Sequence, residues 1–152
     1  MMYRSRAALP EPSTPLTFFD RHAAAAFQSL LDDKPLLPGT ESWKPNTVTK
    51  QAMLFNGCIM GTVFADVNRA AGRTMAHNGA CVCVPKGQQC CGALQVHSGM
   101  MDEARDLARR NIDAFDGPDD EAIVVTAAGC GAALKEYGHL LHEDPEYAER
   151  AA

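Results

Sequence analysis

The chain has 152 residues, of which 46% are hydrophobic and 22% are charged, and its formal net charge is −5. This length and composition are typical of one globular domain with a modest core. The negative charge and the scattered lysines and arginines argue against nucleic acid as the main partner. No apolar run is long enough to span a bilayer, and residues 1–9 lack the apolar core of a secretory signal, so we expect a cytoplasmic protein.

Residues 1–49 differ in composition from the rest of the chain. Six of the nine prolines lie there. Between the prolines, residues 18–31 include four consecutive alanines and favour a short amphipathic helix. We therefore predict a proline-rich linker with one short helix over residues 1–49, followed by a domain over residues 50–152.

From residue 50 onward, short apolar runs alternate with segments of helical spacing. Strands are predicted at 52–55, 81–84 and 122–125. Helices are predicted from Val63 to the stop signal at Asn78, from Ser98 as an N-cap to residue 115, and over 132–141, with a loop before Ser98. This order predicts an α/β fold in which helices flank a small three-stranded parallel sheet.

Six cysteines in a cytoplasmic chain call for a role other than disulfide bonding. Cys58 follows the first predicted strand, Cys90 and Cys91 follow the second, and Cys130 follows the third. Because the carboxyl ends of parallel strands lie at one edge of a sheet, these four thiols should gather there. Burial as a small apolar residue is the alternative for any single cysteine. An adjacent pair in a glycine-flanked loop favours a multinuclear centre instead.

Cys81 and Cys83 receive a different interpretation. They alternate with Val82 and Val84 within the second predicted strand, so both thiols should point to one face of it. We expect these two cysteines to be buried and chemically inert members of the core.

The spacing of Cys58, the Cys90-Cys91-Gly92 run and Cys130 resembles the cysteine-rich "CCG" domain. This domain occurs in iron–sulfur subunits of heterodisulfide reductase and in related oxidoreductases, and the strongest resemblance is to the iron–sulfur subunit of bacterial glycolate oxidase. The segments that carry it are 55–58, 84–94, 97–99, 108–112, 127–137 and 140–148. The family pattern often ends in Cys-x-x-Cys, and Ala127 stands at the first of those two positions.

The resemblance implies an electron-transfer component, or a fragment covering the first cysteine-rich repeat, of a flavin-dependent complex that oxidises glycolate. Such a component is not itself catalytic and relays electrons from the flavoprotein to the respiratory chain. The resemblance implies an iron–sulfur cluster of 4Fe-4S type on Cys58, Cys90, Cys91 and Cys130, with His97 beside it. The implied partners are flavoprotein subunits and a second cysteine-rich domain, without a membrane span, in the cytoplasm or at the inner face of its membrane.

Three other functions are compatible with the sequence. Four thiolates also make a tetrahedral structural zinc site, although an adjacent cysteine pair fits that geometry less comfortably. A thiol–disulfide redox protein would need an attacking and a resolving cysteine, and the sequence contains no Cys-x-x-Cys. A cofactor-free interaction module of an iron–sulfur oxidoreductase is the third alternative.

Overall fold

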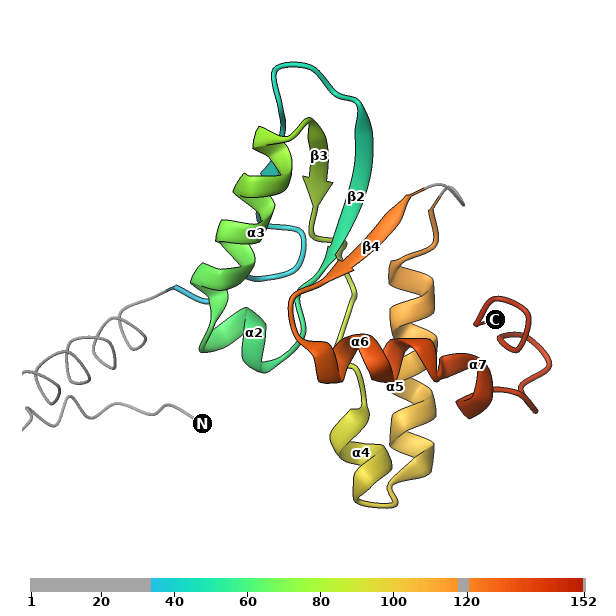
Figure 1. Cartoon of the computed structure of the whole chain (residues 1–152). Coiled ribbons are helices and arrows are strands. Elements are labelled where there is room, and N and C mark those ends of the chain that lie inside the picture. Colours follow the sequence, from blue (N-terminus) through green and yellow to red (C-terminus); the bar gives the residue numbers. More distant parts are fainter. Residues whose placement is uncertain (1–33, 118–120, 152) are drawn as a thin grey trace, which may run out of the picture. The chain divides into compact units, whose positions relative to one another are not determined.

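The fold is built around a four-stranded sheet in the order β1-β3-β2-β4. It is seen in a computed structural model that describes residues 34–117 and 121–151 (Figure 1). The central strand β2 runs parallel to β3 and β4, whereas β1 pairs antiparallel with β3. The bounds of the strands are β1 Ser42–Trp43, β2 Lys50–Phe55, β3 Ala80–Cys83 and β4 Ala122–Val125.

The three predicted strands are present as β2, β3 and β4, and they are parallel as expected. The prediction of a three-stranded sheet was nevertheless wrong, because β1 adds a fourth strand. A two-residue strand between prolines is too short to leave a periodic signal. Residues 34–49 thus contribute β1 to the sheet and Leu36, which is 1% exposed, to the core. The helix predicted over residues 18–31 lies outside the described residues.

Six helices surround the sheet in the described part of the chain (Figure 1). None of these helices has the length and apolar character needed to cross a membrane. The longest two, α3 and α5, carry the pattern that the sequence predicted. The bounds are α2 Ile59–Thr62, α3 Ala65–His77, α4 Ala93–His97, α5 Met101–Ala114, α6 Ala128–Lys135 and α7 Tyr137–Leu140.

Helix α4 occupies a segment that was predicted to be a loop, and this changes the role of Ser98. That residue ends α4, while α5 begins at Met101 without a side-chain cap, so the predicted N-cap was wrong. Leu94 and Val96 of α4 are exposed. A five-residue helix with exposed apolar side chains lacks the amphipathic period by which a sequence reveals a helix.

Helix α3 covers one face of the sheet. Leu54 of β2 and Val82 of β3 are both fully buried there, together with Ala65 of α3. The opposite face carries Phe55, whose ring lies 5.9 Å from that of Phe115 at the end of α5. The two helices therefore lie on opposite faces of the sheet, and β2 is buried between them.

Cys81 and Cys83 are not core residues, contrary to the prediction. Their neighbours Val82 and Val84 are 0% and 2% exposed and take the face under α3, so the cysteines point to the other face. There Cys81 is half-buried and Cys83 is exposed. The alternation of cysteine and valine correctly predicted that both cysteines share one face of β3, but it could not show which face α3 covers.

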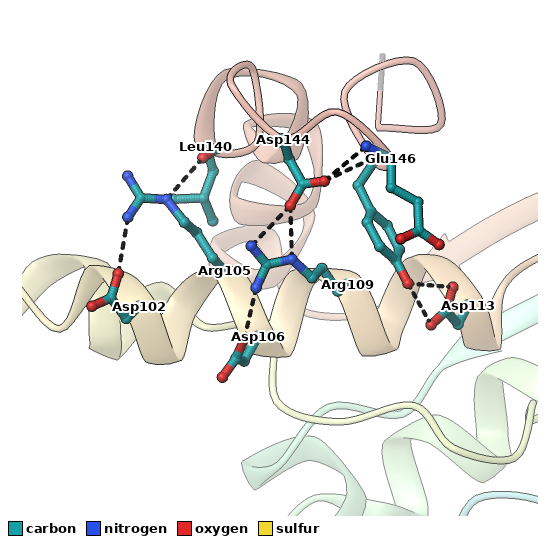
Figure 2. Close-up of polar contacts among 9 residues, drawn as sticks. Asp102, Arg105, Asp106, Arg109, Asp113, Leu140, Asp144 and Glu146 are labelled. Atoms are coloured by element: carbon teal, nitrogen blue, oxygen red, sulfur yellow. Dashed lines mark hydrogen bonds and ion pairs between the residues drawn. The ribbon is translucent and has the colours of Figure 1, made fainter.

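The chain beyond α7 is fastened to α5 by the polar contacts in Figure 2. Arg109 of α5 donates from Nε and Nη2 to one carboxylate oxygen of Asp144, each at 2.8 Å. The other oxygen of Asp144 accepts the backbone N–H groups of Glu146 and Tyr147 at 3.0 Å. Hydrogen bonds from Arg109, ahead of the backbone donors, hold the pKa of Asp144 below its usual 3.8. The Tyr147 hydroxyl also donates to Asp113 of α5.

Candidate functional site

Three connections at the carboxyl edge of the parallel strands carry four cysteines. Cys58 is the N-cap of α2 after β2, Cys90 and Cys91 lie between β3 and α4, and Cys130 lies in the first turn of α6 after β4. The Sγ atoms of Cys58 and Cys90 are 3.4 Å apart. Cys91 is 6% exposed, and the Cys130 thiol is near enough to raise its pKa. The structure therefore brings the four thiols to the edge predicted from the strand order, with Cys58 and Cys90 in contact.

Glycines allow the backbone to turn sharply beside these cysteines. Gly57, just before Cys58, has a φ of +66°, and a Cβ on it would lie 3.9 Å from the Cys130 Sγ. Gly92, just after Cys91, has a φ of +80°. An L side chain at either position would be strained, so both turns depend on glycine.

Burial and neighbouring thiols raise the pKa of Cys58 and of Cys91. For Cys58, partial burial raises the pKa most, and the hydrogen bond and charge of Cys90 raise it further. The hydrogen bond from the N–H of Ile59 lowers it in part. For Cys91, burial again dominates, the N–H of Ala93 lowers the pKa, and the Cys130 thiol raises it. Four thiolates at one edge would repel each other. A bound cationic centre removes that penalty, because a coordinating thiol gives up its proton.

A buried side-chain amide joins the ends of β2 and β4. Asn68 of α3 is 0% exposed, and its Nδ2 donates to the backbone O and the side-chain Oδ1 of Asn56, both at 3.0 Å. The hydroxyl of Thr126, directly after β4, donates to the Asn68 Oδ1 at 2.6 Å. Asn68 thus ties together the connections that lead to Cys58 and to Cys130.

A second buried amide adds the connection after β3. The backbone N–H of Asn56 donates to the Oε1 of Gln88 at 2.6 Å, and the Gln88 Nε2 donates to the carbonyl oxygen of Leu54 at 3.2 Å. Gln88 is 4% exposed. Every cysteine-bearing connection is therefore linked, through side-chain amides or a hydroxyl, to the end of β2.

The sequence reasoning missed these amide residues, although one signal was present. Asn56 and Gln88 each stand two residues before a cysteine of the predicted site. Asparagine before glycine at a strand end, as in Asn56-Gly57, most commonly indicates only a turn. A polar side chain that recurs at the same offset from two cysteines would have marked both as supports of the site.

His97, the histidine predicted to lie beside the cofactor, is the last residue of α4 and is exposed. It lines a cavity of about 440 Å³ together with Cys91, Met101 of α5 and residues of α6 and α7. Within residues 34–117 and 121–151, its ring makes no hydrogen bond. The structure thus places His97 in the same cavity as Cys91, without a direct link to a thiol.

The donor set suits a soft metal centre. In the described ranges, no group of three or more His, Cys, Asp or Glu side chains is arranged closely enough to hold one metal ion. The Sγ atoms of Cys58 and Cys90 are in contact, and Cys91 and Cys130 lie in the neighbouring connections of the same edge. Thiolates are the ligands of zinc and of iron–sulfur clusters. Four thiols spread along one edge fit a centre with several metal atoms better than one tetrahedral ion.

Comparison with known proteins decides the family. A model of the cysteine-rich domain, CCG, matches residues 52–135. The chain belongs to this cysteine-rich domain family. The matched segment contains all four cysteines of the site as well as Asn56, Gln88 and Thr126 of the supporting network. No solved structure matches the chain with significance.

Curated relatives of this CCG domain are longer proteins. A probable glycolate oxidase iron–sulfur subunit from Bacillus subtilis (strain 168) is 45% identical over 103 residues, which cover 68% of this chain and 23% of that protein. The glycolate oxidase iron–sulfur subunit of Escherichia coli (strain K12) is 35% identical over 105 residues, covering 67% and 26%. Lactate utilization protein A of Exiguobacterium sp. (strain ATCC BAA-1283 / AT1b) is 34% identical over 98 residues, covering 64% and 40%. The chain therefore spans about a quarter of the length of the two glycolate oxidase subunits.

Proposed function

We propose that this CCG domain is an electron-transfer module that holds an iron–sulfur cluster through Cys58, Cys90, Cys91 and Cys130. The observation that carries the proposal is the convergence of these four cysteines at one sheet edge, with the Cys58 and Cys90 thiols in contact. The names of the relatives support the choice of iron and sulfide over zinc, since several are iron–sulfur subunits. We further propose that the cluster is of 4Fe-4S type.

In this proposal, the residues of the chain bind the cluster and hold its ligands in position. The thiolates would be the ligands, and the two amide residues Asn68 and Gln88 hold the connections that carry them. When bound, the cluster supplies a one-electron donor and acceptor. His97, in the cavity beside Cys91, is placed to alter the polarity around such a centre. The chain itself performs no substrate chemistry in this proposal.

The larger assembly is a proposal as well. We propose that the domain acts in a flavin-dependent complex of the glycolate oxidase type, with flavoprotein subunits and a second cysteine-rich domain as partners. It would pass electrons from the flavoprotein toward the respiratory chain, in the cytoplasm or at the inner face of its membrane. The support is the identity to glycolate oxidase iron–sulfur subunits, over about a quarter of their length.

Cluster binding can be tested with cysteine variants of the whole chain. The protein would be purified without oxygen, reconstituted with ferrous iron and sulfide, and assayed for bound iron, sulfide and visible absorbance. We expect a brown protein from the wild type and loss of most of the iron in Cys58→Ser and Cys130→Ser. Cys83→Ser is the matched control, because the same substitution is made at an exposed cysteine outside the site.

The outcomes separate the alternatives. A wild-type chain that stays colourless and free of iron after anaerobic reconstitution would overturn the proposal. Binding of zinc alone, in stoichiometric amount and with the same cysteine dependence, would make the domain a structural zinc module. If Cys83→Ser lost as much iron as Cys58→Ser, the iron would not be held specifically by the four-cysteine site.

The substrate of the complex needs a separate experiment. The chain would be co-purified with its flavoprotein partners, and the absorbance of the bound cluster would be followed after addition of glycolate or lactate. Bleaching by glycolate is the expected result. Bleaching by lactate alone would reassign the complex to the substrate in the name of the lactate utilization relatives. No bleaching by either compound, with a cluster present, would refute the proposed electron path.

A further inference from the structure

We propose that Asn111 and Tyr137 are positioning residues that hold the backbone of residues 89–91, so that the Cys90 thiol meets that of Cys58 while Cys91 stays buried. The proposal rests on the proposed function only in taking these two cysteines as ligands. Asn111 lies in α5 and Tyr137 begins α7, and neither side chain belongs to the network around Asn68. Both lie in segments that carry the family resemblance, 108–112 and 127–137, but the sequence predicted no role for either.

The side chain of Asn111 bridges two residues of the cysteine loop. It is 1% exposed. Its Oδ1 accepts the backbone N–H of Gln89 at 2.7 Å, and its Nδ2 donates to the carbonyl oxygen of Cys90 at 3.0 Å. The same Nδ2 donates to the hydroxyl oxygen of Tyr137 at 2.9 Å. Both polar atoms of the amide are therefore engaged, and the side chain has one rotamer that satisfies them all.

Tyr137 continues this chain of hydrogen bonds to the next residue. It is 5% exposed, and its hydroxyl donates to the carbonyl oxygen of Cys91 at 2.9 Å.

Together the two side chains fix one backbone group on each of three successive residues: Gln89, Cys90 and Cys91. The thiols of an adjacent pair would otherwise be free to turn with the loop, since such segments lack secondary structure. Here the Cys90 Sγ lies 3.4 Å from that of Cys58, whereas Cys91 is buried, at 6% exposure. Holding the peptide between them is what keeps one thiol against Cys58 and the other buried.

The Tyr137 hydroxyl can be removed with little change in shape. Tyr137→Phe keeps the buried ring and leaves the carbonyl of Cys91 without this donor. Tyr147→Phe is the matched control, because it also deletes one hydroxyl near α5, but that hydroxyl binds Asp113 and not the cysteine loop. Asn111→Ala releases Gln89 and Cys90 directly and is the second variant.

The readout is the alkylation rate of each cysteine by iodoacetamide, measured by mass spectrometry on the full, reduced and metal-free chain. In Tyr137→Phe we expect Cys91 to react about five-fold faster than in the wild type, the factor given by loss of one ordinary hydrogen bond. Asn111→Ala should accelerate Cys90 as well as Cys91. Cys81 and Cys83 serve as internal references that should not change, and Tyr147→Phe should leave Cys91 at its wild-type rate.

Two results would overturn the proposal. One is a Cys91 rate in Tyr137→Phe equal to that of the wild type. The other is a common acceleration of all the cysteines, the references included, which would mean that Tyr137 only stabilises the fold. Because the chain is metal-free in this assay, failure of the wild type to bind iron would refute the proposed function and leave this readout intact.

Discussion

Asn68→Ala should destabilise the protein far more than an ordinary surface change on the same helix. Asn68 is 0% exposed, and its amide makes three hydrogen bonds: two to Asn56 and one from Thr126. Truncation to alanine removes all three at once. It also leaves two oxygens of the buried Asn56, and the hydroxyl of the half-buried Thr126, without these partners.

The magnitude follows from those contacts. Each hydrogen bond contributes about 1 kcal/mol net to folding. Deletion of the amide also leaves a small cavity, which adds about 0.5–1 kcal/mol at roughly 24 cal/mol per Å³. The expected loss is therefore about 3–4 kcal/mol, a large part of the ~5–15 kcal/mol that stabilises a typical domain. With a urea m-value of about 2 kcal/mol/M, the unfolding midpoint should fall by about 1.5–2 M.

Urea unfolding followed by the fluorescence of Trp43 provides the assay, because this is the chain's only tryptophan and it packs against the sheet core. Asn78→Ala is the matched control. Asn78 follows the same helix, is exposed, and donates one hydrogen bond to the carbonyl of Thr74. We expect that control to lose less than about 1 kcal/mol. An Asn68→Ala variant no less stable than Asn78→Ala would refute the structural role given to the network.

Three further changes test the core packing and the ion pair between Arg109 of α5 and Asp144, which holds the chain beyond α7. Leu54→Ala, at a fully buried position of the central strand, should lower the free energy of unfolding by about 3 kcal/mol in the same assay. Gly72→Ala should shift the Trp43 emission to the red and destabilise the protein, because a Cβ there would overlap the indole ring. Asp144→Asn should lower the melting temperature at neutral pH, where the wild-type carboxylate is paired with Arg109. Since the pKa of Asp144 is held below 3.8, this difference in melting temperature should persist to pH 4 and vanish as the pH falls through the lowered pKa. A difference that stays constant down to pH 2 would contradict a stabilising role of the Arg109–Asp144 ion pair.

The sequence predicted the features of this fold that depend on local patterns. The runs at 52–55, 81–84 and 122–125 are apolar and short, and each is close to a strand of the structure. From their order, parallel pairing and a common carboxyl edge follow by topology alone. The meeting of cysteines that are up to 72 positions apart, from Cys58 to Cys130, was predictable for that reason.

Features that depend on tertiary contacts were not predictable. Alternation placed Cys81 and Cys83 on one face, but only the packing of α3 decides which face is the core. The buried hydrogen bonds that support the site are still harder to predict. Asn68 and Thr126 are 58 positions apart, and the sequence around each gives no sign that its side chain forms a buried hydrogen bond. No local period encodes such a pair, because the energy that selects it arises when both groups leave water together.

The connections that carry the four thiols are thus held by two sets of buried polar side chains. Asn68, with Asn56 and Gln88, ties all three connections to the end of β2, and Asn111 and Tyr137 act from α5 and α7 on the connection after β3. Ordering a connection costs conformational entropy, about 1–2 kcal/mol for each residue that is fixed. Because these hydrogen bonds form when the chain folds, that cost is met before any ligand arrives. For the proposed cluster, less of the binding energy would then be used to order the connections that carry the thiols.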